Sequence, residues 1–424
     1  MFNTIILTQC LGMLSIAFFQ NGFFLNYFTK LGVSNASIAL LFAVPPLVSG
    51  VLMIPFAFLA DRTGKIKQGL IGQVLVVVGL LLVLAVGWVD PRSALLWVGG
   101  GIVIFSIGGT LQGACWFALL NPIVPREIRG RFFGRLRMTF MTVCILFSLL
   151  ITRMLGISER MAIFQIIIGV VCVSHMVRFF TYARIPELEL DHQDPTAKST
   201  LKEALAFVFR IPGFSAFNSY ILLITLFTAA IPLVYGLMQK DVFGFTPAQI
   251  QLMGTLFLAG SVAGNLLGGR LVDRWGVRRV FLGAHILYAL VIFSMLARSW
   301  IPVPLLVQVG MGMFVFSMIA ATSGIAITSE MLELIPARHK SLSTAVCQTL
   351  LSVGIAASQL FVARAISWKI LASEWTVLGH HFSAYDSLLA GFGVMIVILL
   401  ATLGLIPKVV KKVQLLPGSG YPRM

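Results

Sequence analysis

Twelve long apolar segments dominate this chain of 424 residues and restrict the folds that it can adopt. An α-helix rises about 1.5 Å per residue, so about 20 apolar residues span the roughly 30 Å hydrocarbon core of a bilayer. A helix satisfies its own backbone hydrogen bonds, which lipid cannot do for it. The sequence therefore predicts an all-α polytopic membrane protein with twelve transmembrane helices. The expected spans are Ile5–Phe28, Ser37–Ala60, Gly69–Trp88, Ala94–Leu120, Gly134–Leu155, Met161–Ala183, Phe214–Met238, Ala248–Leu271, Val280–Arg298, Val303–Leu332, Ser341–Ile366 and Ser387–Ile406.

The composition supports this class and argues against nucleic-acid binding. Hydrophobic residues make up 58% of the chain and charged residues 11%, with a mean hydropathy of +0.97. Soluble domains carry about 25% charged residues. The net charge of +16 is spread over short loops, where it faces anionic lipid. The bilayer is therefore an expected partner, and nucleic acid is not. The five cysteines fall inside the spans without metal-ligand spacing, so neither a metal nor a cofactor is expected.

The distribution of basic and aromatic residues predicts the orientation in the membrane. With both termini in the cytoplasm, most of the 31 lysines and arginines fall on the cytoplasmic side, as the positive-inside rule requires. Tryptophan prefers the membrane interface, and five tryptophans fall at the predicted outer ends. They are Trp88, Trp97, Trp300, Trp368 and Trp375. We therefore expect an integral protein of the cytoplasmic (inner) membrane with both termini cytoplasmic.

A short motif occurs twice, half a chain apart. The copies are Leu59-Ala-Asp-Arg-Thr-Gly-Lys65 and Leu271-Val-Asp-Arg-Trp-Gly-Val-Arg-Arg279, and their aspartates Asp61 and Asp273 are 212 positions apart. A repeat at half the length predicts two pseudo-symmetric six-helix bundles, an arrangement typical of secondary transporters. The expected division is an N-terminal bundle at 1–184, a cytoplasmic linker at 185–212, a C-terminal bundle at 213–407 and a cytoplasmic tail at 408–424.

The two motif copies resemble the signature loops of the major facilitator superfamily, which lie between spans two and three and between spans eight and nine. Further similarity lies in Val124-Pro-Arg-Glu-Ile-Arg-Gly130 after span four and Ile185-Pro-Glu187 after span six. Ala57 stands where the family usually has glycine, a mild departure because alanine is also small. The resemblance covers the whole chain. It implies the family's fold and transport by alternating access, without enzymatic activity or a catalytic residue.

The resemblance also implies that the motif residues form a gate at the cytoplasmic face. In the family, the motif aspartate faces the N-terminus of a helix in the other half, where the helix dipole favours an anion. Such contacts would favour the outward-facing state and break when the halves rock. A solvated turn that carries positive-inside charge is the alternative. The gate candidates are Asp61, Arg62, Gly64, Lys65, Arg129, Gly269, Asp273, Arg274, Gly276 and Arg278.

Polar residues within the spans that line the family's central cavity are candidates for substrate binding. Their amides, hydroxyls and aromatic rings suit a neutral or zwitterionic small organic solute. The alternative is hydrogen bonding between helices, worth about 0.6 kcal/mol on average. The candidates are Gln20, Asn21, Gln112, Trp116, Thr225, Tyr235, Thr322 and Gln348.

Two arginines near the outer ends of the spans, Arg153 and Arg364, occupy nearly equivalent positions in the two halves. Either they extend to the outer headgroups or they form a vestibule for an anionic substrate.

Signals for proton coupling are weak in this chain. A proton-coupled carrier usually places a titratable carboxylate or histidine in its pathway, but no acidic residue falls in the middle of a predicted span. The span-four stretch Gly109-Thr-Leu-Gln-Gly113 has glycine where proton-driven drug exporters of the family carry arginine, and span five lacks their Gly-Pro signature. His175 and His285 are either coupling residues or packing residues. Glu330 and Glu333 share a helix face and either serve an inner gate or are solvated charges.

Three functional classes compete on this evidence. The first is a secondary-active or facilitative transporter that moves a small organic solute by alternating access. The second is a proton-coupled exporter of amphipathic compounds or lipids, suggested by the aromatic, apolar cavity helices. The third is a membrane enzyme or receptor with the same fold, for which the sequence offers no catalytic motif. We favour the first, acting as a monomer on a small-molecule substrate.

Overall fold

The computed structural model describes residues 1–90, 93–124, 128–188, 213–334, 340–368, 371, 374–377 and 379–404. Most of the expected linker, the expected tail and the side chain of Glu333 lie outside these residues. The helices are α1 (Phe2–Ala17), α2 (Phe23–Lys30), α3 (Asn35–Thr63), α4 (Lys65–Ala85), α5 (Ala94–Ile123), α6 (Arg129–Ile157), α7 (Met161–Ala183), α9 (Phe214–Thr228), α10 (Ile231–Asp241), α11 (Pro247–Trp275), α12 (Val277–Leu296), α13 (Leu305–Leu334), α14 (Lys340–Ser367) and α15 (Ala384–Leu399).

The helices confirm the predicted spans. Within the described residues, eleven helical segments are long and apolar enough to cross a membrane, and α7 begins and ends where the sequence predicts. The first predicted span is also present, but it is divided between α1 and α2. The chain is therefore a polytopic helical membrane protein.

The first spans of the two halves are broken, which the sequence analysis did not predict. Residues 18–22 separate α1 from α2, and residues 229–230 separate α9 from α10. At the first break Gly22 adopts φ 81°, a left-handed conformation that glycine tolerates. At the second, a proline occupies the first turn of α10, where its missing N–H costs no helical hydrogen bond. The breaks occupy equivalent places in the two halves, and broken helices in transporters commonly border the binding site.

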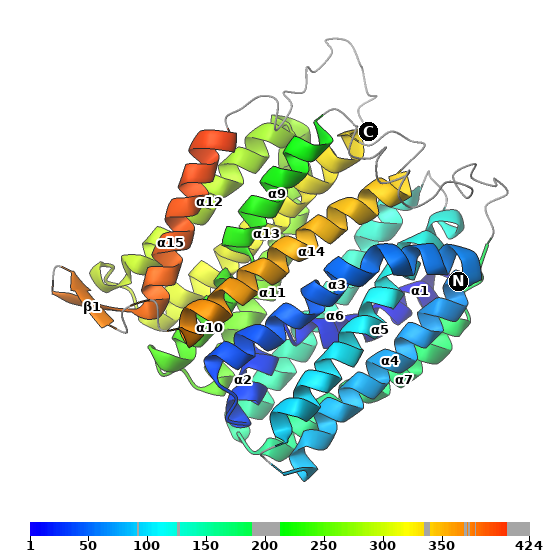
Figure 1. The fold of residues 1–424 in the computed structure, drawn as a ribbon, viewed down its shortest axis with the longest axis horizontal. Coiled ribbons are helices and arrows are strands. Elements are labelled where there is room, and N and C mark those ends of the chain that lie inside the picture. Colours follow the sequence, from blue (N-terminus) through cyan, green and yellow to red (C-terminus); the bar gives the residue numbers. More distant parts are fainter. Residues whose placement is uncertain are drawn as a thin grey trace, which may run out of the picture.

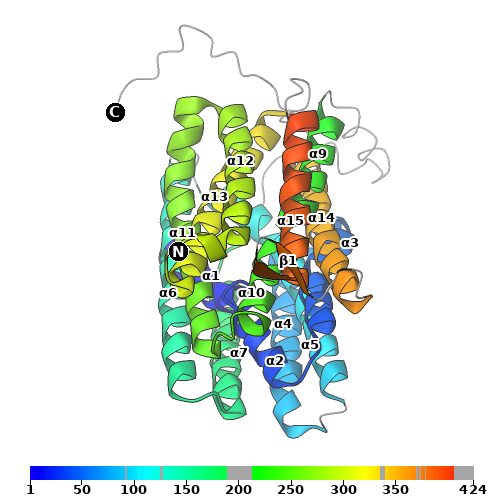
Figure 2. The ribbon, with the colours of Figure 1, turned by 90° about the vertical axis from the view of Figure 1, so that its left-hand side faces the viewer.

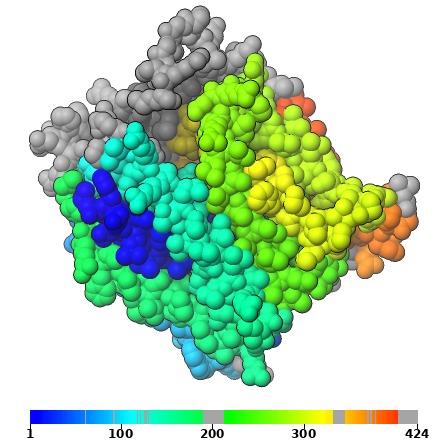
Figure 3. Space-filling model, turned by 180° about the vertical axis from the view of Figure 1, so that it is seen from behind, coloured from blue at the N-terminus to red at the C-terminus, as the bar shows by residue number. Residues whose placement is uncertain are grey.

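Figures 1 and 2 show the helices from the first half of the chain (blue to teal) beside those from the second half (green to red). In the first half, α4 packs against α5 and α7, and α1 packs against α6 and α7. In the second half, α11 packs against α13, α12 against α13 and α15, and α14 against α9. The halves meet along two helix pairs, α3 with α14 and α6 with α11. The second pair lies side by side in Figure 3.

The two ends of the bundle differ, and we name them by their connections. The motif end carries the turns at Gly64, between α3 and α4, and at Gly276, between α11 and α12. The hairpin end carries the antiparallel strands β1 (Glu374–Val377) and β2 (His380–Ser383), which the sequence analysis did not predict. Trp375 of β1 stacks on Phe382 of β2 with ring centroids 4.5 Å apart.

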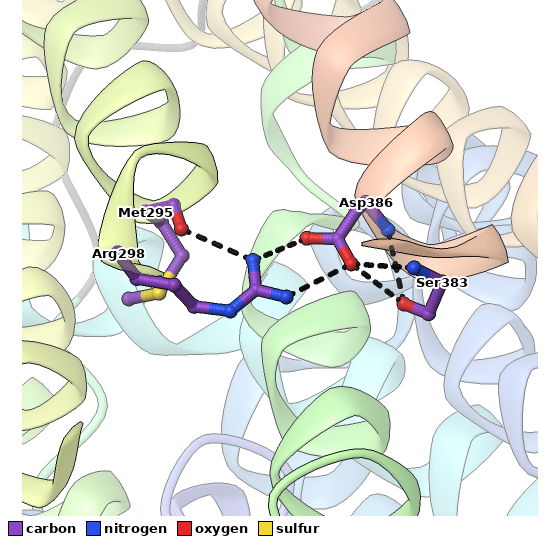
Figure 4. A network of polar contacts seen from close by, with 4 residues as sticks. All are labelled: Met295, Arg298, Ser383 and Asp386. Carbon is purple, nitrogen blue, oxygen red and sulfur yellow. Dashed lines mark hydrogen bonds and ion pairs between the residues drawn. The ribbon is translucent and has the colours of Figure 1, made fainter. Parts of the chain in front are cut away.

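A buried ion pair joins α12 to α15 near the hairpin end (Figure 4). Arg298, in the short 3₁₀ helix after α12, donates 2.5 Å and 3.1 Å hydrogen bonds to the two carboxylate oxygens of Asp386. Ser383 donates its hydroxyl and its backbone N–H to the same carboxylate, each at 2.8 Å. This is the capping box that begins α15, so one carboxylate both caps a helix and pairs with a buried cation.

Candidate functional site

A central cavity of about 750 Å³ lies between the two halves. Helices α1 and α6 line it from the first half, and helices α9 and α11 to α14 line it from the second. It extends from the two breaks, where Gln20 and Ala229 line it, to Ser329 and Met331 near the motif end of α13. This volume falls in the usual range for small-molecule sites, about 300–1,000 Å³.

The cavity wall is mostly apolar, with uncharged polar groups around it. Three of the predicted substrate-binding residues line the cavity: Gln20, Thr225 and Gln348. The remaining polar lining comes mainly from hydroxyl and amide side chains. These include Thr228, Ser261, Asn265, Ser323, Thr328 and Ser329. Within the described part of the chain, no carboxylate lines this cavity, and Arg137 is its one permanently charged side chain.

Asn21, next to Gln20, does not line the cavity. Its side-chain oxygen accepts a 3.1 Å hydrogen bond from the backbone N–H of Phe23, and its amide nitrogen donates to Ser148 of α6 at 3.3 Å. Asn21 is fully buried. It therefore satisfies the broken backbone between α1 and α2, and in this state it is not placed to contact a solute.

Gln112 belongs to a buried polar network inside the first half and does not line the cavity. It donates to Gln73 at 2.7 Å and accepts a 2.5 Å hydrogen bond from Arg178. Gln73 in turn contacts Nδ1 of His175 at 2.7 Å, and Nε2 of this ring lies 2.8 Å from the hydroxyl of Ser15. The network joins α1, α4, α5 and α7, so these amides bond to their helix neighbours.

The other three predicted contacts also lie away from the cavity wall. Trp116 is buried in an apolar cluster with Phe132 and Tyr182. Tyr235 is buried in α10, and its hydroxyl has no hydrogen-bond partner among the described residues. Thr322 donates to the backbone oxygen of Gly264 at 3.2 Å, which fastens α13 to α11.

The two histidines differ in their relation to the cavity. His175 is enclosed in the network of the first half, whereas His285 of α12 lines the cavity and lies 3.1 Å from the hydroxyl of Tyr220. Arg153 and Arg364 are exposed and do not line the cavity. The Arg364 guanidinium lies 5.3 Å from the ring centroid of Trp368.

The first motif copy ends α3 and begins α4. Gly64 provides the turn with φ 97°, and the carboxylate of Glu187 accepts hydrogen bonds from the backbone N–H groups of Lys65 at 2.6 Å and Ile66 at 3.1 Å. An anion at a helix N-terminus is favourable because it faces unsatisfied N–H groups and the positive end of the dipole. Arg62 lies 4.0 Å from the ring centroid of Phe58. The side chains of Asp61 and Arg129 lie outside the described residues.

The second motif copy ends α11 and begins α12 at Gly276, which has φ 78°. Asp273 and Arg274 are exposed, Arg278 is partly buried, and Gly269 faces open space. Asp273 makes no ion pair with any residue that the structure describes. The motif residues therefore lie at one end of the bundle, and a gate contact across the halves is not formed by Asp273 in this state.

Contacts between the halves gather toward the hairpin end. Ser148 of α6 links Asn21 to Gln251 and Thr255 of α11 through hydrogen bonds of 2.8–3.3 Å, and all four residues are buried. Asn26 donates to the backbone oxygen of Pro247 at 2.9 Å.

A second cluster of cross-half hydrogen bonds surrounds Asn35 at the start of α3. Asn35 bonds to Lys240 and Asp241 of α10, each at 2.5 Å, and to Tyr385 of α15 at 2.8 Å. Together these contacts close the cavity from the hairpin end, while it extends toward the motif end.

Arg137 and Asn265 form a cross-half contact on the cavity wall, and this pairing was not predicted from the sequence. A nitrogen of the Arg137 guanidinium donates to Oδ1 of Asn265 at 2.8 Å, which joins α6 to α11. Arg137 falls inside the predicted span Gly134–Leu155, but on the sequence it was counted with the basic residues of the cytoplasmic side. Its position inside that predicted span was the available signal, because an arginine within a span usually faces a cavity.

A membrane-spanning helical bundle with broken first spans and a cavity between two halves, closed at one end, defines a transporter of the alternating-access type. The chain belongs to the Major Facilitator Superfamily, whose sequence model matches residues 5–356 and 219–417. It is a membrane transporter that moves a solute by alternating access, as a secondary-active or facilitative carrier. None of the curated proteins compared with this chain matches it.

Solved transporters share the fold at low sequence identity. A mutant of the nucleoside transporter NupG is 14% identical with a TM-score of 0.70, and the alignment covers 95% of this chain and 98% of that one. A D-xylose–proton symporter is 15% identical with a TM-score of 0.68, covering 95% and 96%. A bacterial homologue of the lysosomal transporter Spinster, in an inward-facing and unoccupied conformation, is 14% identical with a TM-score of 0.69, covering 96% of each chain. These similarities establish the fold and leave the solute open.

Proposed function

We propose that the central cavity is the substrate site of this transporter and that it takes a small polar organic molecule. The observation that carries the proposal is the cavity itself, about 750 Å³ between the halves, with Gln20, Thr225 and Gln348 on its wall. These groups come from both halves, so a bound solute would contact both halves, and its binding could be coupled to their relative movement. Asn265 and Ser323 add further hydrogen-bonding groups to this wall.

We further propose that the motif end faces the cytoplasm of a cell with a cytoplasmic inner membrane, so that this state is inward-facing. Arg62, Arg274 and Arg279 lie exposed at the motif end, which suits the positive-inside rule. Trp300 and Trp368 lie exposed toward the opposite end, as interfacial tryptophans do.

In this proposal the motif residues act when the motif end closes. Asp61 and Asp273 would then meet the other half, while the contacts of Asn21 and Asn35 would open. The exposure of Asp273 in the present state supports this assignment. The protein would work as a monomer, without cofactor, nucleic acid or enzymatic chemistry.

A second candidate function is proton-coupled export of amphipathic compounds or lipids. The specific observation in its favour is His285, a titratable side chain on the wall of a mainly apolar cavity. The absence of carboxylates from the described cavity wall favours the first function, because the paired acidic groups of many proton carriers have no counterpart there.

The first experiment is a thermal-shift screen of the purified protein against a solute library, since a ligand that binds the folded state raises its melting temperature. Hits are then tested on Gln20→Ala and Gln348→Ala, with Ser294→Ala, exposed on α12, as the matched control. The proposal predicts at least tenfold weaker binding for the first two variants and less than twofold change for the control. Equal binding by all three would remove the cavity as the site.

Flux into proteoliposomes separates the two candidate functions. Equilibration of a polar hit without a pH gradient supports the first. Accumulation of amphipathic compounds that requires a pH gradient and is lost in His285→Gln supports the second.

A further inference from the structure

The described lining of the cavity carries a positive charge that no acidic lining residue balances. Arg137 carries a permanent positive charge on the wall, and the lining residues that the structure describes include no acid. Glu330 on α13 is buried, with 2% of its surface exposed, and it does not line the cavity although Ser329 and Met331 on either side of it do. A cation facing a largely apolar cavity attracts an anion more strongly than one in bulk water does.

The guanidinium of Arg137 is held in place and still has donors to offer. It gives one hydrogen bond, at 2.8 Å, to Oδ1 of Asn265. Asn265 is itself fixed, because its amide nitrogen donates to the backbone oxygen of Ser261 at 2.7 Å. A guanidinium has five N–H donors in a planar fork, and Arg137 is exposed at the cavity. The remaining donors can therefore meet a ligand.

The position of Arg137 distinguishes it from the basic residues of the loops. It lies eight residues after Arg129, where α6 begins, which places its α carbon about 12 Å inside the helix at 1.5 Å per residue. Arginines within membrane spans usually face the interior of the bundle or a water-filled cavity.

We propose that Arg137, positioned by Asn265, recognises a carboxylate on the transported solute. This inference rests on the proposed function and narrows it to organic acids and zwitterions. A carboxylate accepts two parallel hydrogen bonds from a guanidinium, which gives both orientation and charge neutralisation. Hydroxyl and amide groups of Ser261, Gln20 and Gln348 would then serve the rest of the molecule.

The same geometry links binding to movement. Arg137 is on α6 of the first half and Asn265 is on α11 of the second, so their hydrogen bond crosses the boundary between the halves. A carboxylate that draws the guanidinium toward itself competes with the Asn265 oxygen. Solute binding would therefore alter a contact between α6 and α11 that crosses the boundary between the halves.

The test uses matched pairs of probes that differ in charge at one group: nicotinate with nicotinamide, lactate with lactamide, and benzoate with benzamide. Binding of each is measured by thermal shift on the full-length protein. The inference predicts that at least one acid binds at least tenfold more tightly than its amide. Arg137→Gln abolishes this preference, and Arg137→Lys keeps part of it. Arg131→Gln, an exposed arginine on the same helix outside the cavity lining, leaves it unchanged within twofold.

Asn265→Asp gives an independent test that keeps the arginine. It places a carboxylate where the amide oxygen now lies, 2.8 Å from the guanidinium, and neutralises its charge. The inference predicts at least tenfold weaker binding of the acid and little change for the amide. This variant remains informative if Arg137→Gln does not fold.

The outcomes separate this inference from the proposed function. If acids and amides bind equally and both depend on Gln348, the cavity stands as the substrate site and the carboxylate assignment is overturned. If an acid binds with the same preference in Arg137→Gln and Asn265→Asp, the assignment is also overturned. If none of the six probes binds, it is overturned for small carboxylates, and the solute library alone decides the proposed function.

Discussion

The backbone carbonyl of Asn21 lies directly against the α carbon of Gly254, with no room between them for a β carbon. Asn21 belongs to the break in the first span, and Gly254 belongs to α11 in the other half. The contact places the broken backbone of one half against the side of α11 where Gly254 has no side chain, in the other half. Small residues allow helices in membranes to approach this closely.

Enlarging Gly254 should therefore keep the hairpin end from closing. Gly254→Val is expected to disfavour the present state by about 1–3 kcal/mol, the usual cost of overpacking. The measurement is the rate at which an impermeant maleimide labels a cysteine introduced at Asn26, which is 4% exposed here. Labelling should accelerate at least fivefold.

Gly283→Val is the control for this experiment, because a β carbon at Gly283 on α12 meets nothing within 4 Å. The five native cysteines are buried, so the labelling background is low. An unchanged rate in Gly254→Val would show that closure does not depend on this contact.

The Arg298–Asp386 pair should be essential for stability. Both side chains are buried, and removing one partner leaves an uncompensated charge, which typically costs about 3–5 kcal/mol. Asp386→Asn is therefore expected to lower the melting temperature strongly, whereas Glu374→Gln on exposed β1 should not. The double variant Arg298→Met with Asp386→Leu should lose less than the single variant. A double variant as unstable as the single one would contradict the uncompensated-charge explanation.

Glu187 should stabilise the start of α4. Its carboxylate accepts the N–H groups of Lys65 and Ile66, so Glu187→Ala is expected to cost about 1 kcal/mol, as lost helix caps do. Hydrogen–deuterium exchange should accelerate in the peptide that contains these amides. Glu159→Ala, an exposed acidic residue between α6 and α7, is the comparison. Equal exchange in both variants would mean that the cap contributes nothing.

Gln112 and Gln348 should respond in opposite ways. Gln112→Ala leaves the buried guanidinium of Arg178 without its amide partner, so it should cost about 1–3 kcal/mol of stability and leave ligand affinity within twofold. Gln348→Ala should reduce affinity with little effect on stability. Thermal unfolding with and without a bound solute measures both quantities. If Gln112→Ala bound the solute tenfold more weakly and kept normal stability, Gln112 would be a substrate-binding residue after all.

The spans could be predicted because their apolar length is a property of the sequence itself. Whether a span forms one continuous helix could not be predicted in this way. The first span is apolar on both sides of the polar residues Gln20-Asn21-Gly22, so its overall hydropathy predicts a span although the helix stops there. Hydropathy records transfer into lipid, whereas the break depends on the Asn21 side chain, which accepts the N–H of Phe23, and on the packing of α11, which is a tertiary contact.

In the candidate site, the sequence likewise does not determine which way an individual side chain points. Gln20 and Asn21 are adjacent amides, yet Gln20 lines the cavity and Asn21 bonds to Ser148. Composition identifies polar groups within spans but not the direction in which each one points. Arg137 was overlooked because it was counted with the cytoplasmic basic residues, although it falls inside the predicted span Gly134–Leu155.

The two ends of the bundle should differ in how they respond to ionic strength. The cross-half contacts of Asn21, Ser148 and Thr255 join uncharged, buried groups, which dissolved ions barely reach. The motif end presents exposed charges such as Asp273 and Arg274, whose interactions weaken over a Debye length of about 8 Å in physiological salt. Salt therefore acts more strongly on the exposed charges of the motif end than on these buried contacts, and the preference between the two states becomes a property of the surrounding solution as well as of the chain.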